Sequence, residues 1–263
     1  MVFGFWFRTL EYLTCGGNYY MNPIDINSDV GEGIGNETQL LPLLTSCNIA
    51  CGGHAGDTQT MEEVTALALQ YELKIGAHPG YEDKTNFGRV PITLSRKELR
   101  QSITRQIREL KTIVEDKGGR LHHVKPHGAL YNQASVDREI ASIIIDTIAA
   151  IDDELILYAP FNSVIAEMAK GILPIKIEGF ADRNYNSDYT LVSRSQPNAL
   201  ITEPKSVMEH ISHMVAKQQL HTITGEICPM HIETLCVHGD TPKALEILQY
   251  IRKEASHHNI KFE

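Results

Sequence analysis

The run over residues 25–33, DINSDVGEG, places two carboxylates, Asp29 and Glu32, where a strand-like pattern ends among glycines. Apolar and polar residues alternate from Ile24 onward, which is typical of a strand, and Gly31 and Gly33 then favour a turn. A carboxylate at such a strand end can accept a proton, orient water or bind a metal ion. Asp and Asn are also frequent in solvated turns, so this segment alone leaves both interpretations open.

Five later strand-like runs end in similar polar segments that contain glycine. These segments are NIACGGHAGD, GAHPGYED, VKPHGALYN, EGFADRNY and CVHGDTP. The carboxyl ends of the strands in a parallel barrel share one face, and substrate sites lie in the loops of that face. The recurrence is hard to explain by turn statistics and predicts one functional cluster. Its expected members are Asp29, Glu32, His54, Asp57, His78, Lys125, His127, Glu178, Asp182, Arg183 and His238.

The elements that must position these loops alternate from Ile24 onward between short strands and amphipathic helices, the pattern of a parallel α/β sheet. Strands are predicted over residues 24–27, 46–50, 74–77, 122–125, 155–159, 175–178 and 234–237. Helices are predicted over residues 58–71, 95–116, 137–151, 161–170, 204–217 and 242–256, with a hairpin over 221–230. Helix caps are predicted at Asp57, at Ser95 with Glu98 as a capping box, and at Thr241. Seven strands in 263 residues indicate a single (β/α)7-type barrel.

The first strand has one face of polar side chains. Asp25, Asn27 and Asp29 share the same parity, so all three are expected to point into the barrel while Ile24 and Ile26 point toward the helices. A buried Asp25 requires a partner such as a Lys or Arg side chain.

Composition limits the classes of partner. The formal net charge is −9 and no run of Lys or Arg occurs, so nucleic-acid binding is not expected. The apolar N-terminal run is too short to span a bilayer, and no membrane association is expected. Five scattered Cys residues without a CxxC pair are typical of reduced thiols in the cytoplasm, and Cys47 and Cys51 are expected to be small buried hydrophobes. A small-molecule substrate is the expected ligand.

The first twenty residues differ from the rest of the chain. They are aromatic-rich, and Arg8 and Glu11 interrupt the apolar run, which does not fit a secretory signal. Met21 directly precedes the first predicted strand. We therefore expect residues 1–20 to be a poorly ordered extension, a start at Met21, and a barrel domain over residues 21–263.

The successive loop motifs resemble those of the LamB/YcsF family. The motifs are DINSDVGEG, NIACGGHAGD, GAHPGY, FGR, VKPHGALYN, FADRNY, SRSQPNALI and CVHGDTP, in this order from Ile24 to the C-terminal region. The family commonly has Cys in place of Ser28 and a bulky residue in place of Gly53, and many members have a longer segment after Glu32. The first twenty residues have no counterpart in the family.

The resemblance implies a seven-stranded barrel related to the glycoside hydrolase and deacetylase barrels. It also implies an activity, the ATP-dependent cleavage of 5-oxo-L-proline to L-glutamate in a 5-oxoprolinase complex whose B and C subunits are the partners. ATP and the Mg²⁺ that it carries are then the expected cofactors. No GxxxxGK[ST] motif occurs in the chain, so ATP binds by another mode or a partner supplies part of its site.

Roles for individual residues follow from their chemistry within this activity. Asp29 is the first candidate for the general base, and Lys125 either stabilises a developing negative charge or forms a structural ion pair with Asp29 or Asp25. His127 and His54 can transfer protons or lock glycine turns. Arg183 can hold the substrate carboxylate through two hydrogen bonds. Further candidates for substrate binding are Asn27, Glu32, His78, Arg89, Asp182 and His238, while Tyr131 and Asn132 are expected to shape the pocket.

Two other functions remain open from sequence. The first is a metal-dependent deacetylase or carbohydrate hydrolase, in which Asp29, His54 and His127 would bind the metal as in related deacetylase barrels. The ATP-dependent reaction requires no such site, so a protein-bound transition metal is not the expected cofactor. The second is a non-catalytic subunit that binds the substrate and presents it to its partners.

Overall fold

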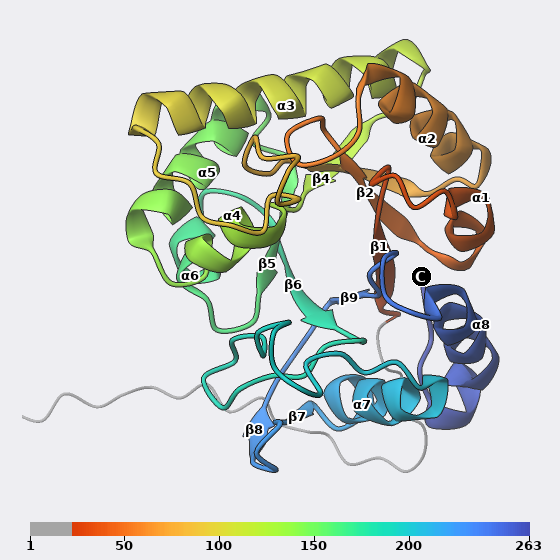
Figure 1. The fold of residues 1–263 in the computed structure, drawn as a ribbon. Coiled ribbons are helices and arrows are strands. Elements are labelled where there is room, and N and C mark those ends of the chain that lie inside the picture. Colours follow the sequence, from red (N-terminus) through yellow and green to blue (C-terminus); the bar gives the residue numbers. More distant parts are fainter. Residues whose placement is uncertain (1–22) are drawn as a thin grey trace, which may run out of the picture.

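The computed structural model describes residues 23–263, and the expectations for residues 1–20 and Met21 lie outside the described residues. Seven parallel strands close into a barrel in the order β1-β2-β3-β4-β5-β6-β9, with β9 pairing both β6 and β1 (Figure 1). The strands are β1 (Asp25–Val30), β2 (Ser46–Ala50), β3 (Lys74–His78), β4 (Leu121–Val124), β5 (Ile156–Pro160), β6 (Ile175–Phe180) and β9 (Thr234–Cys236). The predicted seven-stranded barrel is thereby confirmed.

Helices surround the barrel as an outer layer (Figure 1). They are α1 (Glu37–Leu40), α2 (Thr58–Gln70), α3 (Arg96–Asp116), α4 (Gly128–Ala134), α5 (Arg138–Ile151), α6 (Val164–Ala169), α7 (Pro204–Ala216) and α8 (Ala244–Glu254), with 3-10 turns over Leu41–Leu43 and Ala255–His258. The predicted hairpin is present as β7 (Gln219–His221) and β8 (Ile227–Pro229), which pair antiparallel beside α7. Among the described residues, no helix combines the length and the apolar character needed to cross a membrane.

The long helix α3 shows why the outer layer forms. Its apolar residues recur every three or four positions, and Ile103, Ile107, Leu110 and Val114 are all completely buried. Ser95 caps the start of the helix with the predicted capping box. Its hydroxyl accepts from the backbone N–H of Glu98, and the Glu98 carboxylate accepts from the backbone N–H of Ser95.

The other two predicted caps have different outcomes. The Asp57 carboxylate accepts from the backbone N–H of Thr60 and caps α2 as predicted. The Thr241 prediction was wrong, because α8 begins only at Ala244 and Lys243 precedes it in a left-handed conformation with φ of 63°. Thr241 instead donates its hydroxyl hydrogen to Asp182. The sequence patterns also missed the short helices α1 and α4, which span too few residues to show a period.

The lower part of the barrel interior is polar. Asp25 is fully buried and accepts hydrogen bonds from the hydroxyls of Thr45 at 2.7 Å, Ser46 at 2.7 Å, Tyr158 at 3.1 Å and Thr234 at 2.5 Å. The expectation of a Lys or Arg partner was wrong, since four hydroxyl donors satisfy the carboxylate instead. The inward orientation of Asp25 is confirmed.

Hydrogen bonds connect this lower layer to the residues above it. The Asn27 amide donates to Thr234 at 2.7 Å and to Glu178 at 3.0 Å. The Asn48 amide donates to the side-chain oxygens of both Asn27 and Asp29 at 2.8 Å. The first strand therefore holds Asp29 in a network that extends through the barrel, which restricts the orientation of its carboxylate.

Candidate active site

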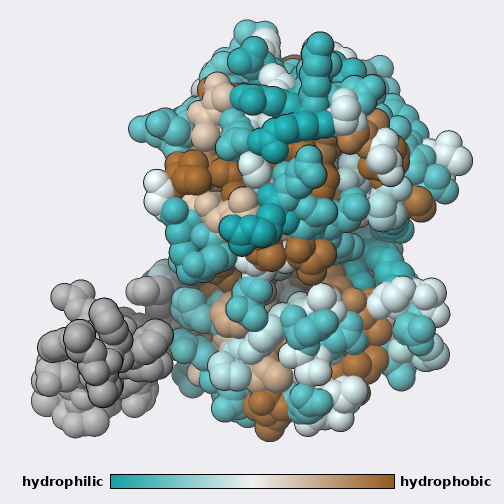
Figure 2. Space-filling model, turned by 90° about the vertical axis from the view of Figure 1, so that its left-hand side faces the viewer, coloured by the Kyte–Doolittle hydropathy of each residue, from teal (hydrophilic) through white to brown (hydrophobic). Residues whose placement is uncertain are grey.

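A cavity of about 690 Å³ lies at the carboxyl ends of the barrel strands. Figure 2 shows that one face of the molecule is hollowed across its middle, with hydrophobic side chains along the hollow. Of the residues predicted for the site, those that line the cavity are Asp29, Glu32, His78, Arg89, Lys125, His127, Arg183 and His238. Asn27, His54 and Asp182 are buried behind this wall and contact the residues that line it. Asp57, also expected in the cluster, is a helix cap.

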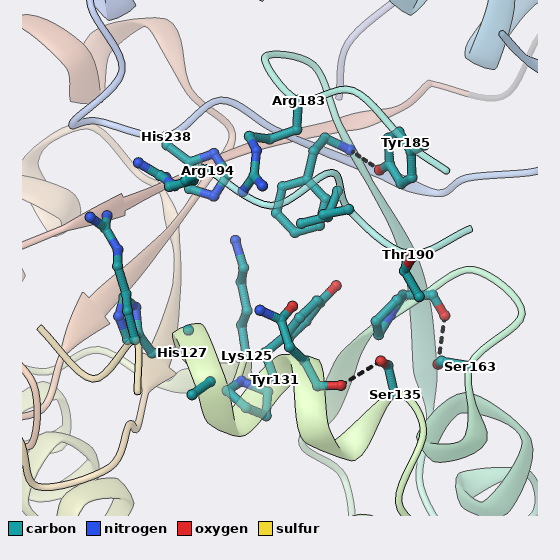
Figure 3. A pocket seen from close by; sticks show the side chains of 18 of the residues that line it. Lys125, His127, Tyr131, Ser135, Ser163, Arg183, Tyr185, Thr190, Arg194 and His238 are labelled. Carbon is teal, nitrogen blue, oxygen red and sulfur yellow. Dashed lines mark hydrogen bonds between the residues drawn. The ribbon is translucent and has the colours of Figure 1, made fainter. Parts of the chain in front are cut away.

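Lys125 forms the floor of the cavity. It follows β4, is only 2% exposed, and points into the cavity between His127 on one side and Arg183, Arg194 and His238 on the other (Figure 3). Its Nζ lies 2.9 Å from Asp29 Oδ1 and 3.0 Å from Glu178 Oε1. The expected ion pair with Asp29 is therefore present, while the ammonium also faces the cavity.

The pairing fixes the charges on the floor. Burial alone would lower the pKa of Lys125, but the charges of Asp29, Cys236 and Glu178 raise it well above its usual value. Burial would likewise raise the pKa of Asp29, but His78 and Lys125 hold it well below its usual value. Lys125 is thus an ammonium and Asp29 a carboxylate at neutral pH.

Tyr131 and Cys236 contact the groups of the floor. Tyr131, on α4, donates its hydroxyl hydrogen to Glu178 Oε2 at 2.8 Å, and the Cys236 Sγ lies 3.1 Å from Lys125 Nζ. Burial raises the pKa of the Cys236 thiol well above its usual value. Tyr131 and Asn132 both line the cavity, as expected. The contact between Cys236 and Lys125 was not predicted from the sequence.

Three histidines and Glu32 gather beside Asp29. His54 Nε2 lies 2.9 Å from Glu32 Oε1, and His127 Nδ1 lies 2.9 Å from His78 Nε2 and 3.3 Å from Glu32 Oε1. Burial lowers the pKa of both His54 and His127 well below the usual range. Burial, followed by the charges of Asp29 and Asp240, raises the pKa of Glu32 to about 8. The rings of His54 and His127 are therefore neutral at neutral pH. They supply no positive charge that would stabilise the ionised form of Glu32.

Arginines dominate the mouth of the cavity. Arg89 and Arg194 both bind the carboxylate of Asp240, with Arg194 Nη1 at 3.1 Å from Oδ2. Arg183 is 7% exposed and donates from Nη2 to the Val192 carbonyl at 2.7 Å, while its buried Nε has no hydrogen-bond partner among residues 23–263. Three guanidinium groups against the two carboxylates of Asp240 and Asp188 leave the mouth with a net positive charge, which favours an anionic ligand.

His238 and Asp182 act as a unit in the opposite wall. Asp182 is fully buried and accepts from His238 Nδ1 at 2.9 Å and from the His238 backbone N–H at 3.1 Å. Burial would raise the pKa of Asp182, but His238 lowers it below its usual value. Asp182 therefore orients His238 toward the cavity, where His238 lies beside the Phe180 ring.

Several residues of the site were not identified from sequence. Asn48 has the inward parity of β2, which was a usable signal for its contact with Asp29. Arg194 lies in the long loop after β6 and Asp240 in the short loop after β9, and their pairing across 46 positions leaves no sequence period. As a whole, the site offers an ammonium, a carboxylate and neutral imidazoles around a cavity whose entrance attracts anions. These groups suit the opening of a polar carbonyl compound that carries a negative charge.

Comparison with known proteins identifies the family. The model of the LamB/YcsF family matches residues 24–263. The A subunit of 5-oxoprolinase from Limosilactobacillus fermentum is 44% identical over 239 residues, which is 89% of this chain and 95% of that protein. The A subunit of 5-oxoprolinase from Shouchella clausii is 41% identical over 246 residues, or 91% of this chain and 97% of that protein.

Solved structures agree with this assignment. The lactam utilization protein from Thermus thermophilus is 33% identical with a TM-score of 0.86, covering 92% of this chain and 99% of that chain. A putative cellobiose-phosphate cleavage protein from Enterococcus faecalis, 11% identical with a TM-score of 0.56, shares the fold alone and covers 92% of this chain and 97% of that chain. The resemblance drawn from the loop motifs is confirmed, and this chain belongs to the LamB/YcsF family.

Proposed function

We propose that this chain is the lactam-binding, ring-opening component of an ATP-dependent 5-oxoprolinase that converts 5-oxo-L-proline to L-glutamate together with the B and C subunits of that enzyme. The names of the relatives, the A subunit of 5-oxoprolinase and a lactam utilization protein, support a lactam substrate. The observation that carries the proposal is the buried Lys125 ammonium, held by Asp29 and Glu178 and facing an arginine-rich entrance. 5-Oxoproline has a matching pair of groups, a carbonyl oxygen and a carboxylate.

The chemistry explains why ATP is needed. A five-membered lactam is a stabilised amide, and transfer of the γ-phosphoryl group to its carbonyl oxygen makes the carbonyl carbon a better electrophile. Water then adds to that carbon, the carbon–nitrogen bond breaks as the nitrogen takes a proton, and γ-glutamyl phosphate forms. A second water hydrolyses this acyl phosphate to glutamate and phosphate, while ADP carries the remaining phosphates.

The residues of this chain have distinct parts in such a sequence. Lys125 stabilises the negative charge on the carbonyl or phosphoryl oxygen, because a fixed ammonium in a buried site interacts strongly with developing charge. Asp29 accepts the proton of the attacking water, since its low pKa keeps it ionised. His127 and His78 line the same cavity beside Asp29. Mg²⁺ enters with ATP.

The partners supply what this chain lacks. The sequence contains no GxxxxGK[ST] motif. We therefore assign part of the nucleotide site to the B or the C subunit. The proposed location is the cytoplasm, where ATP is available and where free thiols are expected, as at Cys47, Cys51, Cys228 and Cys236.

Reconstitution tests the proposal. Co-expression of this chain with the B and C subunits is expected to yield glutamate from 5-oxoproline only when Mg²⁺ and ATP are present. Omitting each subunit in turn identifies the phosphorylating component, and omission of this chain is expected to abolish glutamate release. Absence of turnover from three folded subunits would overturn the assignment. Turnover without ATP would favour the metal-dependent hydrolase instead, for which the cluster of His54, His78, His127 and Glu32 is the supporting observation.

Arg183 provides a prediction about substrate affinity. Arg183 lines the cavity, and its buried Nε has no hydrogen-bond partner within residues 23–263, so we expect the guanidinium to form a bidentate pair with the substrate carboxylate. Arg183→Lys keeps the charge but loses the second hydrogen bond, which is worth about 1.5–3 kcal/mol when the partner is charged. The KM for 5-oxoproline is expected to rise roughly 10- to 100-fold, with a smaller change in kcat. Arg105→Lys, in an exposed pair with Glu82, is the matched control and is expected to change neither constant.

A further inference from the structure

The hydrogen positions of two histidines in the cavity wall follow from their neighbours. His78 Nδ1 lies 2.7 Å from the Lys125 carbonyl oxygen, and His127 Nε2 lies 2.9 Å from the Phe87 carbonyl oxygen. A carbonyl oxygen only accepts hydrogen bonds, so each of these nitrogens carries a hydrogen. With one hydrogen on each ring, at the nitrogen that faces the carbonyl, His78 Nε2 and His127 Nδ1 are both left with a lone pair.

These two unprotonated nitrogens face each other at 2.9 Å. Two lone pairs at hydrogen-bond distance repel each other unless a proton or a cation lies between or beside them. A metal cation satisfies both nitrogens at once, and backbone carbonyls that hold the opposite ring nitrogens are the usual support of metal-binding histidines.

Glu32 completes a set of ligands. Its Oε1 lies 3.3 Å from His127 Nδ1 and 3.8 Å from His78 Nε2. Zinc bonds of about 2.0–2.1 Å in tetrahedral geometry separate neighbouring ligand atoms by about 3.3 Å. The three observed separations, 2.9, 3.3 and 3.8 Å, surround that value. We propose that Glu32, His78 and His127 bind a divalent transition-metal cation of the Zn²⁺ type.

His54 supports this site without binding the cation. Its ring is nearly parallel to the ring of His127, with centroids 3.5 Å apart. Because the lone pair of an imidazole lies in the ring plane, a cation in the plane of His127 is out of the plane of His54. His54 Nε2 instead forms a hydrogen bond with Glu32 Oε1 at 2.9 Å, and His54 does not line the cavity. It is a positioning residue for Glu32.

This ligand set differs from the Asp29, His54 and His127 set considered from sequence. Asp29 is already paired with Lys125, and its Oδ2 lies 3.4 Å from His78 Nε2. A second group of ligand atoms, from Asp29, Cys236 and His238, also converges. The Lys125 ammonium contacts both Asp29 and Cys236 there and already supplies a positive charge. The set of Glu32, His78 and His127 therefore carries the metal site.

The proposed cation has an open side. All three ligands line the cavity, and two His with one Glu is a set that leaves a position for water or for a substrate oxygen. The cation would face the same space as the Lys125 ammonium, where it can polarise a lactam carbonyl or a phosphoryl oxygen. The site itself is inferred from hydrogen positions and distances, so it does not depend on the proposed 5-oxoprolinase activity.

Cobalt binding to the purified chain tests the site without ATP, substrate or partner subunits. After treatment with a chelator and its removal, the wild-type chain is expected to bind one equivalent of Co²⁺ with the visible absorption of a low-coordinate site, and Zn²⁺ is expected to displace it. His78→Gln and His127→Gln each remove a ligand and are expected to abolish the stoichiometric absorption. His54→Gln is expected to weaken binding by roughly 10- to 100-fold, the usual effect of losing an outer partner.

Two measurements keep the test decisive. His213→Gln is the matched control. The His213 ring contacts the His221 ring, with centroids 3.8 Å apart, and is not one of the proposed ligands, so this variant is expected to bind Co²⁺ like the wild type. If the histidine variants fold poorly, the near-isosteric Glu32→Gln replaces them, and Zn²⁺ is expected to raise the Tm of the wild type but not of this variant. Wild-type protein without Co²⁺ absorption, or ligand variants that bind like the wild type, would overturn the proposal. Neither result bears on ATP-dependent turnover.

Discussion

Replacing Asp29 with Asn is expected to lower the kcat of the reconstituted enzyme by about 10²–10⁴-fold, the usual contribution of a positioned general base. Asn keeps the shape of the side chain and can retain the hydrogen-bond acceptor for Asn48, which lies 2.8 Å from Asp29 Oδ1. Lys125 also keeps Glu178 as a partner at 3.0 Å. The variant is therefore expected to fold, and the loss should be confined to the chemical step.

The measurement is steady-state release of glutamate by the complex with the B and C subunits at saturating ATP. Asp57→Asn is the matched control, because Asp57 follows β2 in a similar loop but caps α2, and Asn is an equally good cap. It is expected to keep the wild-type kcat. Full activity of Asp29→Asn in a folded complex would show that this chain presents the substrate and that a partner supplies the base.

The arrangement of the site was largely predictable because of the barrel topology. Parallel strands bring their carboxyl ends to one face, so Asp29, His78 and Lys125 had to lie together once their strands were identified. The period of two in β1 likewise predicted that Asp25, Asn27 and Asp29 point inward, and all three are buried there.

The pairing of individual groups was less predictable, because it depends on how the strands are placed around the barrel. Asp25 is satisfied by four hydroxyls from β5, β9 and the start of β2, and the hydrophobicity pattern of those segments carries no sign of this. Thr241 has the residue type and position of a helix cap, but its hydroxyl bonds to Asp182, a contact across 59 positions. Tertiary contacts of this kind override local preferences.

The histidine cluster shows a further limit of sequence reasoning. His54, His78 and His127 were each predicted to reach the active face, but their roles depend on which nitrogen faces which neighbour. The carbonyls of Lys125 and Phe87 decide this for His78 and His127, and those carbonyls belong to the backbone. No residue type encodes a backbone acceptor, so the division between ligands and a positioning residue required the structure.

Lys125→Met is expected to destabilise the protein as well as inactivate it. Met fills much of the same volume but leaves Asp29 and Glu178 in the barrel without the ammonium that lies 2.9 and 3.0 Å from them. Removing one partner of a buried ion pair costs about 3–5 kcal/mol of unfolding free energy, because the remaining charge stays buried without compensation. In addition, loss of the ammonium that stabilises the transition state should lower the kcat of the folded enzyme by about 10²–10³-fold.

Urea unfolding of the purified chain measures the first effect, and Lys243→Met is its control. Lys243 forms an exposed pair with Glu203, and its replacement is expected to leave the unfolding midpoint unchanged. The double variant Lys125→Met with Asp29→Asn should be more stable than Lys125→Met alone, because only one uncompensated carboxylate then remains. If Lys125→Met were as stable as the wild type, the charges assigned to the cavity floor would be wrong. If the variant lost stability but kept the wild-type kcat, Lys125 would be only a partner in a structural ion pair.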